Sequence, residues 1–218
     1  MKGIAKRLRG PNRNVFINCP FDVGYRACFE ALLFVITVSG YKVRCALEDP
    51  DGANIRFNKL RKLIRESRRT IHDLSRIELS ENALPRFNMP FELGLAIGAK
   101  YFGGPKLRRN SALIMVRQDY VINAYLSDLG GNDPVAHDDN PHEVIRAVTR
   151  YLHTSPQGKV LRGAQSTIAR FERFKETLPA LAAALDRAHS EVDPFRDYRV
   201  YLALLKEFVD IEQQAAAL

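Results

Sequence analysis

The sequence predicts an α/β protein with a flavodoxin-like, doubly wound parallel sheet and a C-terminal helical extension. Up to about residue 153, short apolar runs of strand-forming residues alternate with segments of helical spacing. The connections between them are short, which favours right-handed crossovers that place helices on both faces of a parallel sheet. Beyond residue 165, the apolar spacing is helical and no strand pattern recurs.

The first strand is predicted at residues 14–19, an apolar run rich in strand-forming side chains. Residues 22–39 then place apolar side chains three and four apart, which predicts a helix that ends at Gly40. The same patterns predict strands at 41–47, 69–74 and 111–116, and helices at 56–67, 89–102 and 141–152. Residues 126–141 are rich in Gly, Asp and Asn and predict a long surface loop.

The predicted organisation is a basic tail at 1–13, the α/β domain at 14–153, a linker at 154–165 and the helical extension at 166–218. Within the extension, Pro179 predicts the start of a new helix behind Thr177. A final helix is expected from about 194 to 214. The apolar stripes of these helices need a packing partner, and the sequence leaves open whether it is the α/β domain or a second copy of the extension.

Composition places the chain among globular proteins, because 46% of its 218 residues are hydrophobic and 27% are charged. Its net charge of +8 is unevenly distributed: residues 1–13 and 56–69 are strongly basic, and residues 127–143 are acidic. These patches leave nucleic-acid binding open as an alternative. It is not favoured, because no zinc-finger spacing, RNA-binding strand or helix-turn-helix accompanies the basic run.

Three cysteines, Cys19, Cys28 and Cys45, lie in apolar contexts without CxxC spacing, which predicts buried free thiols. Four potential metal ligands lie close together in the sequence: His137, Asp138, Asp139 and His142. They fall in the predicted loop and not on one face of a regular element, so no metal site is expected. No apolar stretch is long enough to cross a bilayer and no secretory segment opens the chain, so a cytoplasmic protein without membrane contact is expected.

Ligands of open parallel sheets bind at the carboxyl ends of the strands, so the residues that follow each strand are candidates for a site. The helix predicted after Asn88 begins at the same edge, and Glu92 in its expected first turn should point toward the same cleft. The candidate site residues are Asn18, Phe21, Asp22, Glu48, Arg56, Asp73, Ser75, Arg76, Arg86, Asn88 and Glu92.

Three of the four carboxylates in this set also have a structural interpretation. Glu92 in a first helical turn would complement the helix dipole. Asp22 would cap the first helix, and Asp73 would accept hydrogen bonds in the turn after its strand. Taken alone, none of the three identifies a catalytic site.

Two segments resemble a known group of proteins. Residues 15–17, followed by Asp22, resemble the first strand and loop of Toll/interleukin receptor (TIR) domains. The segment Phe-Glu-Leu-Gly-Leu-Ala-Ile-Gly at 91–98 is similar to the Glu-x-Gly-x-Ala stretch of nucleoside 2-deoxyribosyltransferases and their TIR-like relatives. This resemblance implies that Glu92 is a catalytic carboxylate acting on the ribose carbon of a nucleoside or of NAD.

The resemblance therefore predicts an N-glycosidase, a hydrolase that takes NAD or a related nucleotide as its substrate and needs no cofactor. A neutral base needs a general acid to leave, and Asp73 and Asp22 are the candidates for that role. Arg56, Arg76 and Arg86 are candidates for binding phosphates. The resemblance also implies a role in bacterial antiphage defence, with the C-terminal helices forming a homo-oligomer or docking a regulatory protein.

Two other functions stay open at this point: a noncatalytic sensor that binds a nucleotide in the same cleft, and a TIR-like interaction module. Other enzyme classes lose their usual signatures, because the sequence contains no GxxxxGK[ST], GxGxxG, GxSxG or HExxH motif.

Overall fold

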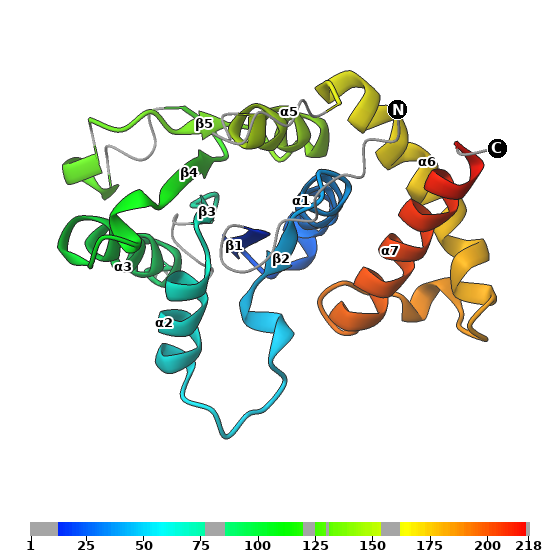
Figure 1. Cartoon of the computed structure of the whole chain (residues 1–218), viewed down its shortest axis with the longest axis horizontal. Coiled ribbons are helices and arrows are strands. Elements are labelled where there is room, and N and C mark those ends of the chain that lie inside the picture. The colour runs from blue at the N-terminus through cyan, green and yellow to red at the C-terminus, as the bar shows by residue number, and fades with distance from the viewer. Residues whose placement is uncertain (1–12, 77–85, 120–124, 130, 154–161, 217–218) are drawn as a thin grey trace.

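The computed structural model describes residues 13–76, 86–119, 125–129, 131–153 and 162–216. Its centre is a five-stranded, all-parallel sheet with the strand order β2-β1-β3-β4-β5, and the fold is the predicted flavodoxin-like, doubly wound arrangement (Figure 1). The strands are β1 (Asn14–Asn18), β2 (Lys42–Arg44), β3 (Arg69–Asp73), β4 (Ser111–Val116) and β5 (Val135–Ala136).

Helices cover both faces of this sheet. On one face α1 (Arg26–Val38) packs against α5 (Pro141–His153), and on the other α2 (Arg56–Glu66) packs against α3 (Asn88–Phe102). Helix α1 is almost wholly apolar and is buried along most of its length, as expected for a helix enclosed between a sheet and a further layer. Two predicted elements are shorter than expected, because a 3-10 helix replaces one end of each. Val23–Tyr25 forms a 3-10 helix at the start of the segment predicted as a helix at 22–39, and Ala46–Glu48 forms one at the end of the segment predicted as a strand at 41–47.

Strand β5 corrects the prediction of a continuous loop at 126–141. It contains two residues, which pair with Met115 and Val116 of β4. A strand of this length has no measurable periodicity, and its flanks are rich in turn-forming residues. The strand is therefore defined by its hydrogen bonds to β4 and not by its own sequence pattern.

Pro179 does not begin a new helix, and this prediction is wrong. It lies inside the continuous helix α6 (Ala164–Ala183), which starts within the predicted linker; residues 154–161 of that linker lie outside the described part. A proline inside a helix removes one backbone hydrogen bond and crowds the preceding turn. Leu178 and Ala182 are both buried on the same helix face, and this packing spans the proline and keeps the helix continuous.

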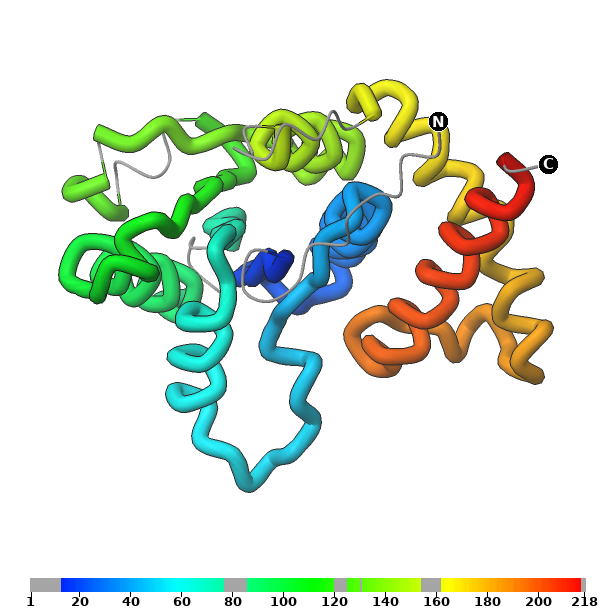
Figure 2. Tube along the Cα trace, viewed as in Figure 1, coloured from blue at the N-terminus to red at the C-terminus, as the bar shows by residue number. Residues whose placement is uncertain are grey.

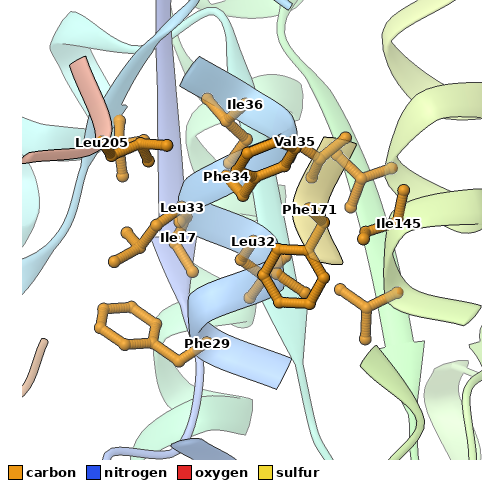
Figure 3. Close-up of a cluster of buried hydrophobic side chains, with 14 of the residues drawn as sticks. Ile17, Phe29, Leu32, Leu33, Phe34, Val35, Ile36, Ile145, Phe171 and Leu205 are labelled. Atoms are coloured by element: carbon orange, nitrogen blue, oxygen red, sulfur yellow. The ribbon is translucent and has the colours of Figure 1, made fainter. Parts of the chain in front are cut away.

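The C-terminal extension packs on the α/β domain, which answers the question that the sequence left open. Helices α6 and α7 (Tyr198–Ala215) lie outside α1 and α5 as a further layer (Figure 2). The aromatic ring of Phe34 in α1 lies 5.7 Å from that of Phe174 and 6.3 Å from that of Phe208. Figure 3 shows Phe34, Phe171 and Leu205, which belong to three different helices, within one buried hydrophobic cluster. A single hydrophobic cluster therefore runs through both parts of the chain.

Truncation of Phe174 tests this shared core. Its side chain is fully buried against Phe34, Tyr201 and Phe208, so Phe174→Ala should lower the free energy of unfolding by about 3–5 kcal/mol. In urea unfolding monitored by circular dichroism, we expect the variant to show a single transition whose midpoint shifts to a lower urea concentration. The exposed Leu185→Ala is the control and should cost less than about 1 kcal/mol. Two separate transitions would show that the extension folds independently.

The basic run at 56–69 does not form one continuous surface. Arg61, Lys62 and Arg65 are exposed on α2, whereas Arg69 is buried in β3 with its guanidinium 5.0 Å from the ring centre of Tyr41. The predicted basic tail lies outside the described residues except for Arg13. Among the helices described, none has the length and apolar character needed to cross a membrane.

Candidate functional site

The candidate site lies where the strand order reverses, between β1 and β3. Asn18 ends β1 and pairs in register with His72 of β3. The side-chain amide of Asn18 donates a 2.9 Å hydrogen bond to the backbone carbonyl of Met89 and lies 3.0 Å from His72 Nδ1. This buried amide joins the first turn of α3 to the carboxyl edge of the sheet, the edge at which open parallel sheets bind their ligands.

Glu92 is the fifth residue of α3, so the expectation that it lies in the first turn is wrong. Its side chain is on the buried face of the helix, together with the apolar residues Met89, Leu93 and Ala96. A helix dipole acts mainly within the first turn, so it does not explain a carboxylate at this position. Glu92 instead takes a place that helical spacing reserves for an apolar side chain.

The charged partner of Glu92 is Arg56, the first residue of α2, whose Nη2 lies 3.3 Å from Glu92 Oε1. Burial raises the pKa of Glu92, and the guanidinium of Arg56 opposes part of that rise, so the net shift is upward. The side chain of Arg56 is 62% exposed. The ion pair therefore joins a buried carboxylate to a cation that solvent or a ligand can reach.

Large apolar side chains that neighbour this ion pair in sequence are exposed, a feature that the sequence did not predict. Phe57 and Phe91 are neighbours of the pair in sequence, and their rings lie 6.3 Å apart. Phe87 is 68% exposed, Phe91 55% and Phe57 42%. We call Phe57, Phe87 and Phe91 the aromatic surface. Aromatic rings that protrude into solvent provide faces on which a planar base stacks. The sequence signal for this surface was the presence of aromatic residues at the beginning of two predicted helices.

Asp73 ends β3 and has no exposed area. Its Oδ1 accepts hydrogen bonds from the backbone N–H of Ser75 at 2.9 Å and from the Ser75 hydroxyl. Its Oδ2 accepts hydrogen bonds from the Tyr25 hydroxyl at 2.5 Å and from His137 Nε2 at 2.9 Å. Burial alone would raise the pKa of Asp73, but the hydrogen bonds from His137, Ser75 and Tyr25 outweigh it and lower the pKa.

This geometry favours the structural interpretation of Asp73 over the proton-donating one. Both carboxylate oxygens already accept two hydrogen bonds each, and a lowered pKa keeps the group ionised at neutral pH. A general acid needs the opposite: a proton to give and access to the leaving group. His137 contributes to this network from the segment after β5, and no sequence pattern links it with Asp73.

Asp22 has two roles in the structure. Its Oδ1 accepts a 3.1 Å hydrogen bond from the backbone N–H of Tyr25, which caps the short helix that precedes α1. Its carboxylate also lies 3.2 Å from Arg86 and 3.9 Å from Arg76. Arg76 in turn contacts Asp139 at 3.1 Å. Arg76 and Arg86, two of the three arginines predicted to bind phosphates, therefore pair with carboxylates of the chain itself.

The remaining candidates are Glu48, Phe21 and Asn88, and the contacts given for Glu48 and Phe21 are with other residues than Glu92. Glu48 forms a salt bridge with Arg44 at 2.6 Å and lines a hollow of about 420 Å³ between the end of β2, α2 and α7. Phe21 packs its ring 5.5 Å from Phe29 in the core. Asn88 is exposed at the start of α3. The structure thus brings together Asn18, Arg56 and Glu92, and it gives Glu48 and Phe21 other partners.

Another hollow, of about 310 Å³, lies beside α3 and is lined by Ile97, Lys100, Tyr101 and Ser111 among others. Ser111 begins β4, so this hollow lies toward the amino ends of the strands. Ligand sites of open parallel sheets lie at the opposite, carboxyl edge. We therefore place the candidate site at Glu92 and not in this hollow.

All three cysteines are buried and free, as predicted. Burial raises the pKa of Cys28 to about 12 and that of Cys45 to about 11, and it also raises the pKa of Cys19. Burial lowers the pKa of His72 to about 3, so this imidazole stays neutral. These groups lack the thiolate and the base that a cysteine nucleophile requires.

Comparison of the chain with protein-family models, with curated proteins and with solved structures gives no match.

Proposed function

We propose that this protein is an N-glycosidase that hydrolyses the bond between ribose and base in NAD or a related nucleotide, with Glu92 as its catalytic carboxylate. The observation that carries this proposal is the position of Glu92: an acid with a raised pKa on the buried face of α3, at the point where strand order reverses. Buried acids with a raised pKa in such places are typical of reactive sites.

The bond chemistry suits a single carboxylate. When the ribosyl–nitrogen bond breaks, its electron pair goes to the leaving base and positive charge develops on the ribose ring. A carboxylate beside the ring stabilises this charge or traps the ribose covalently. Water then supplies the hydroxyl group that ends on the ribose carbon and loses a proton to solvent.

The state of Asp73 favours NAD over a neutral nucleoside as substrate. Nicotinamide leaves from a cationic pyridinium and needs no proton, whereas a neutral purine needs a general acid. Asp73 is ionised, buried and hydrogen-bonded, so it is poorly suited to donate a proton. Asp22, the other candidate, already accepts the cap hydrogen bond from Tyr25 and pairs with Arg76 and Arg86. A site that relies on Glu92 alone therefore suits a substrate whose base departs unprotonated.

Binding roles follow from exposure and charge. Arg56 is the exposed cation beside Glu92, and a guanidinium binds phosphate oxygens through paired N–H donors. The aromatic surface offers a stacking face for a base or a nicotinamide ring. Arg76 would contribute less, because its side chain is only 19% exposed and already pairs with both Asp22 and Asp139. Arg86 is 49% exposed and pairs with Asp22 as Arg56 does with Glu92, so it is a second candidate for a phosphate contact.

A noncatalytic nucleotide sensor is the second candidate, because Arg56 and the aromatic surface would bind a nucleotide whether or not its bond is cleaved. The resemblance to TIR-like proteins supports a further proposal, a role as a bacterial antiphage defence effector that assembles into an oligomer or binds a regulatory protein. The apolar stripes of α6 and α7 pack within the chain, so assembly would use exposed residues such as Leu185 and Ile211.

The test is release of free base from NAD, NADP and a panel of nucleosides at high protein concentration. The wild-type chain should release nicotinamide from a dinucleotide and little base from purine nucleosides. No release from any substrate, combined with saturable nucleotide binding by calorimetry, would favour the sensor. Equal release from purine nucleosides would contradict the preference for a base that leaves unprotonated.

The pH profile of the reaction provides a second prediction. Ionised Glu92 is the reactive form, so kcat/KM should fall as the pH drops through the pKa of Glu92 in the free enzyme. Arg56 lowers that pKa, so Arg56→Ala should move the acidic limb of the kcat/KM profile to higher pH. Arg65→Ala, exposed on the same helix, is the matched control and should leave the limb in place. A limb that stays fixed in Arg56→Ala would argue against Glu92 as the titrating group.

A further inference from the structure

Cys28, His137 and Asp139 come together from two separate parts of the chain. Cys28 lies in the first turn of α1, and the other two residues follow β5. One potential ligand atom of each residue, the thiol sulfur, a ring nitrogen and a carboxylate oxygen, lies within 4.8 Å of the other two. Cys28 and His137 are buried, and Asp139 is partly exposed. The cluster therefore sits at the boundary between the core and the carboxyl edge of the sheet.

The hydrogen bonds of His137 determine which of its two ring nitrogens is left to bind another group. Nε2 lies 2.9 Å from Asp73 Oδ2 and 2.8 Å from the Ser75 hydroxyl, so it carries the proton that the ionised carboxylate accepts. Nδ1 is then the ring nitrogen that remains for another partner. It is fully buried and has no hydrogen-bond partner among the described residues, which is a costly state for a polar atom.

This pattern is the one found at metal-binding histidines. A ligating imidazole usually donates its other N–H to a carboxylate, which fixes the tautomer and makes the free nitrogen a better ligand. Asp73 holds His137 in that way. A ring nitrogen of His137, the sulfur of Cys28 and the carboxylate of Asp139 form the mixed N, S and O set that suits zinc, and Nδ1 is the ring nitrogen without a partner among the described residues.

We propose that Cys28, His137 and Asp139 bind a divalent metal ion of the zinc class, with water in the fourth position. Ligand bonds of about 2.0–2.3 Å in a tetrahedron place the ligand atoms about 3.3–3.8 Å from one another. The three ligand atoms lie within 4.8 Å of one another, so small side-chain adjustments suffice to reach this geometry. The thiol proton of Cys28 passes to solvent as the sulfur binds the metal. Arg76, which now contacts Asp139, keeps a second carboxylate in Asp22.

The metal would join α1 to the segment between β5 and α5. These two parts of the chain also meet through Tyr25 and His137, both of which hydrogen-bond to Asp73. The proposed ion would therefore link these two parts of the chain at the edge of the sheet, next to the hydrogen bonds of Asp73. The proposal does not depend on whether Glu92 is catalytic.

The experiment uses the full chain without an affinity tag, stripped with a chelator, and titrated with Co²⁺ and with Zn²⁺. Binding of one equivalent of Co²⁺ should produce a thiolate-to-cobalt charge-transfer absorption. Added Zn²⁺ should displace the Co²⁺, and the absorption should then disappear. Cys28→Ala should abolish this absorption and weaken Zn²⁺ binding at least 100-fold by calorimetry. Cys19→Ala and Cys45→Ala are the matched controls, because they remove buried thiols outside the cluster, and both should bind as wild type does.

A second variant keeps the test decisive if Cys28→Ala does not fold. Asp139→Asn changes a partly exposed side chain, should fold normally by circular dichroism, and should weaken Zn²⁺ binding at least tenfold. Absence of a saturable one-equivalent titration in the wild-type chain would overturn the proposal. Unchanged affinity in Asp139→Asn, or an unchanged absorption in Cys28→Ala, would overturn it as well, because the metal would then bind elsewhere.

Discussion

Glu92→Gln should lower the rate of base release from NAD by about 10²–10³-fold or more while leaving the fold intact. The substitution keeps the size of the side chain and removes the negative charge that stabilises the developing cation, and the loss of one such preorganised group typically costs this factor. The measurement is kcat/KM for nicotinamide release by wild type and variant at pH 7.

The same variant should be at least as stable as wild type at neutral pH. A carboxyl group whose pKa is raised by folding stabilises the protein below its unfolded-state pKa and costs stability once the pH rises through the folded value. Glu92→Gln removes that cost, and the exposed Arg56 loses little when its partner is neutral. A purely structural Glu92 would give the reverse result: a lower melting temperature together with unchanged nucleotide binding.

Glu176→Gln, exposed on α6, is the control for both measurements and should change neither rate nor stability. If Glu92→Gln retains wild-type turnover, Glu92 is not the catalytic carboxylate. If neither protein turns over any substrate but both bind nucleotide, the sensor function gains support.

Asp73→Asn should destabilise the protein by about 3–5 kcal/mol. The carboxylate accepts hydrogen bonds from Tyr25, Ser75 and His137 inside the core. An amide at this position presents N–H donors to groups that are themselves donors, and breaking a buried charged network in this way is among the costliest single changes. Urea unfolding followed by circular dichroism measures the loss.

The matched control is Asp197→Asn, because Asp197 forms a partly exposed ion pair with Arg187 at 3.7 Å. It should cost less than about 1 kcal/mol. Normal stability with strongly reduced turnover in Asp73→Asn would restore the general-acid role that the sequence analysis considered for this residue. Reduced stability with normal turnover in the folded fraction would confirm the structural role.

Periodicity predicted most of the fold because it is a local property. Helices α1, α2, α3 and α5 and strands β1, β3 and β4 each bury one face or one apolar run, and that requirement is visible within a few residues of sequence. The predictions were wrong for β5 and for α6, where contacts with distant residues and not the local sequence pattern determine the structure. The two residues of β5 are held by pairing with β4, and α6 continues through Pro179 because residues on both sides of it are buried.

The candidate site was predictable in its location but less so in its members. Knowledge of where parallel sheets bind ligands selected Asn18 and Glu92, which the structure places at the same edge. It also selected Glu48, whose salt bridge with Arg44 depends on a local turn that the sequence pattern does not specify. The exposure of Phe87 and Phe91 was missed, since aromatic residues in a helix are ordinarily expected in the core.

By itself the sequence determined the class of fold, the order of its main elements and the presence of an acid at an apolar helical position. These properties depend on neighbouring residues and on rules that hold for every parallel sheet. Only the tertiary structure decided that Asp73 is held by Tyr25 and His137, that Arg56 faces Glu92, and that Cys28 meets His137 and Asp139. Contacts between residues far apart in the chain follow from how the elements pack in three dimensions, and that packing leaves no periodic mark on the sequence.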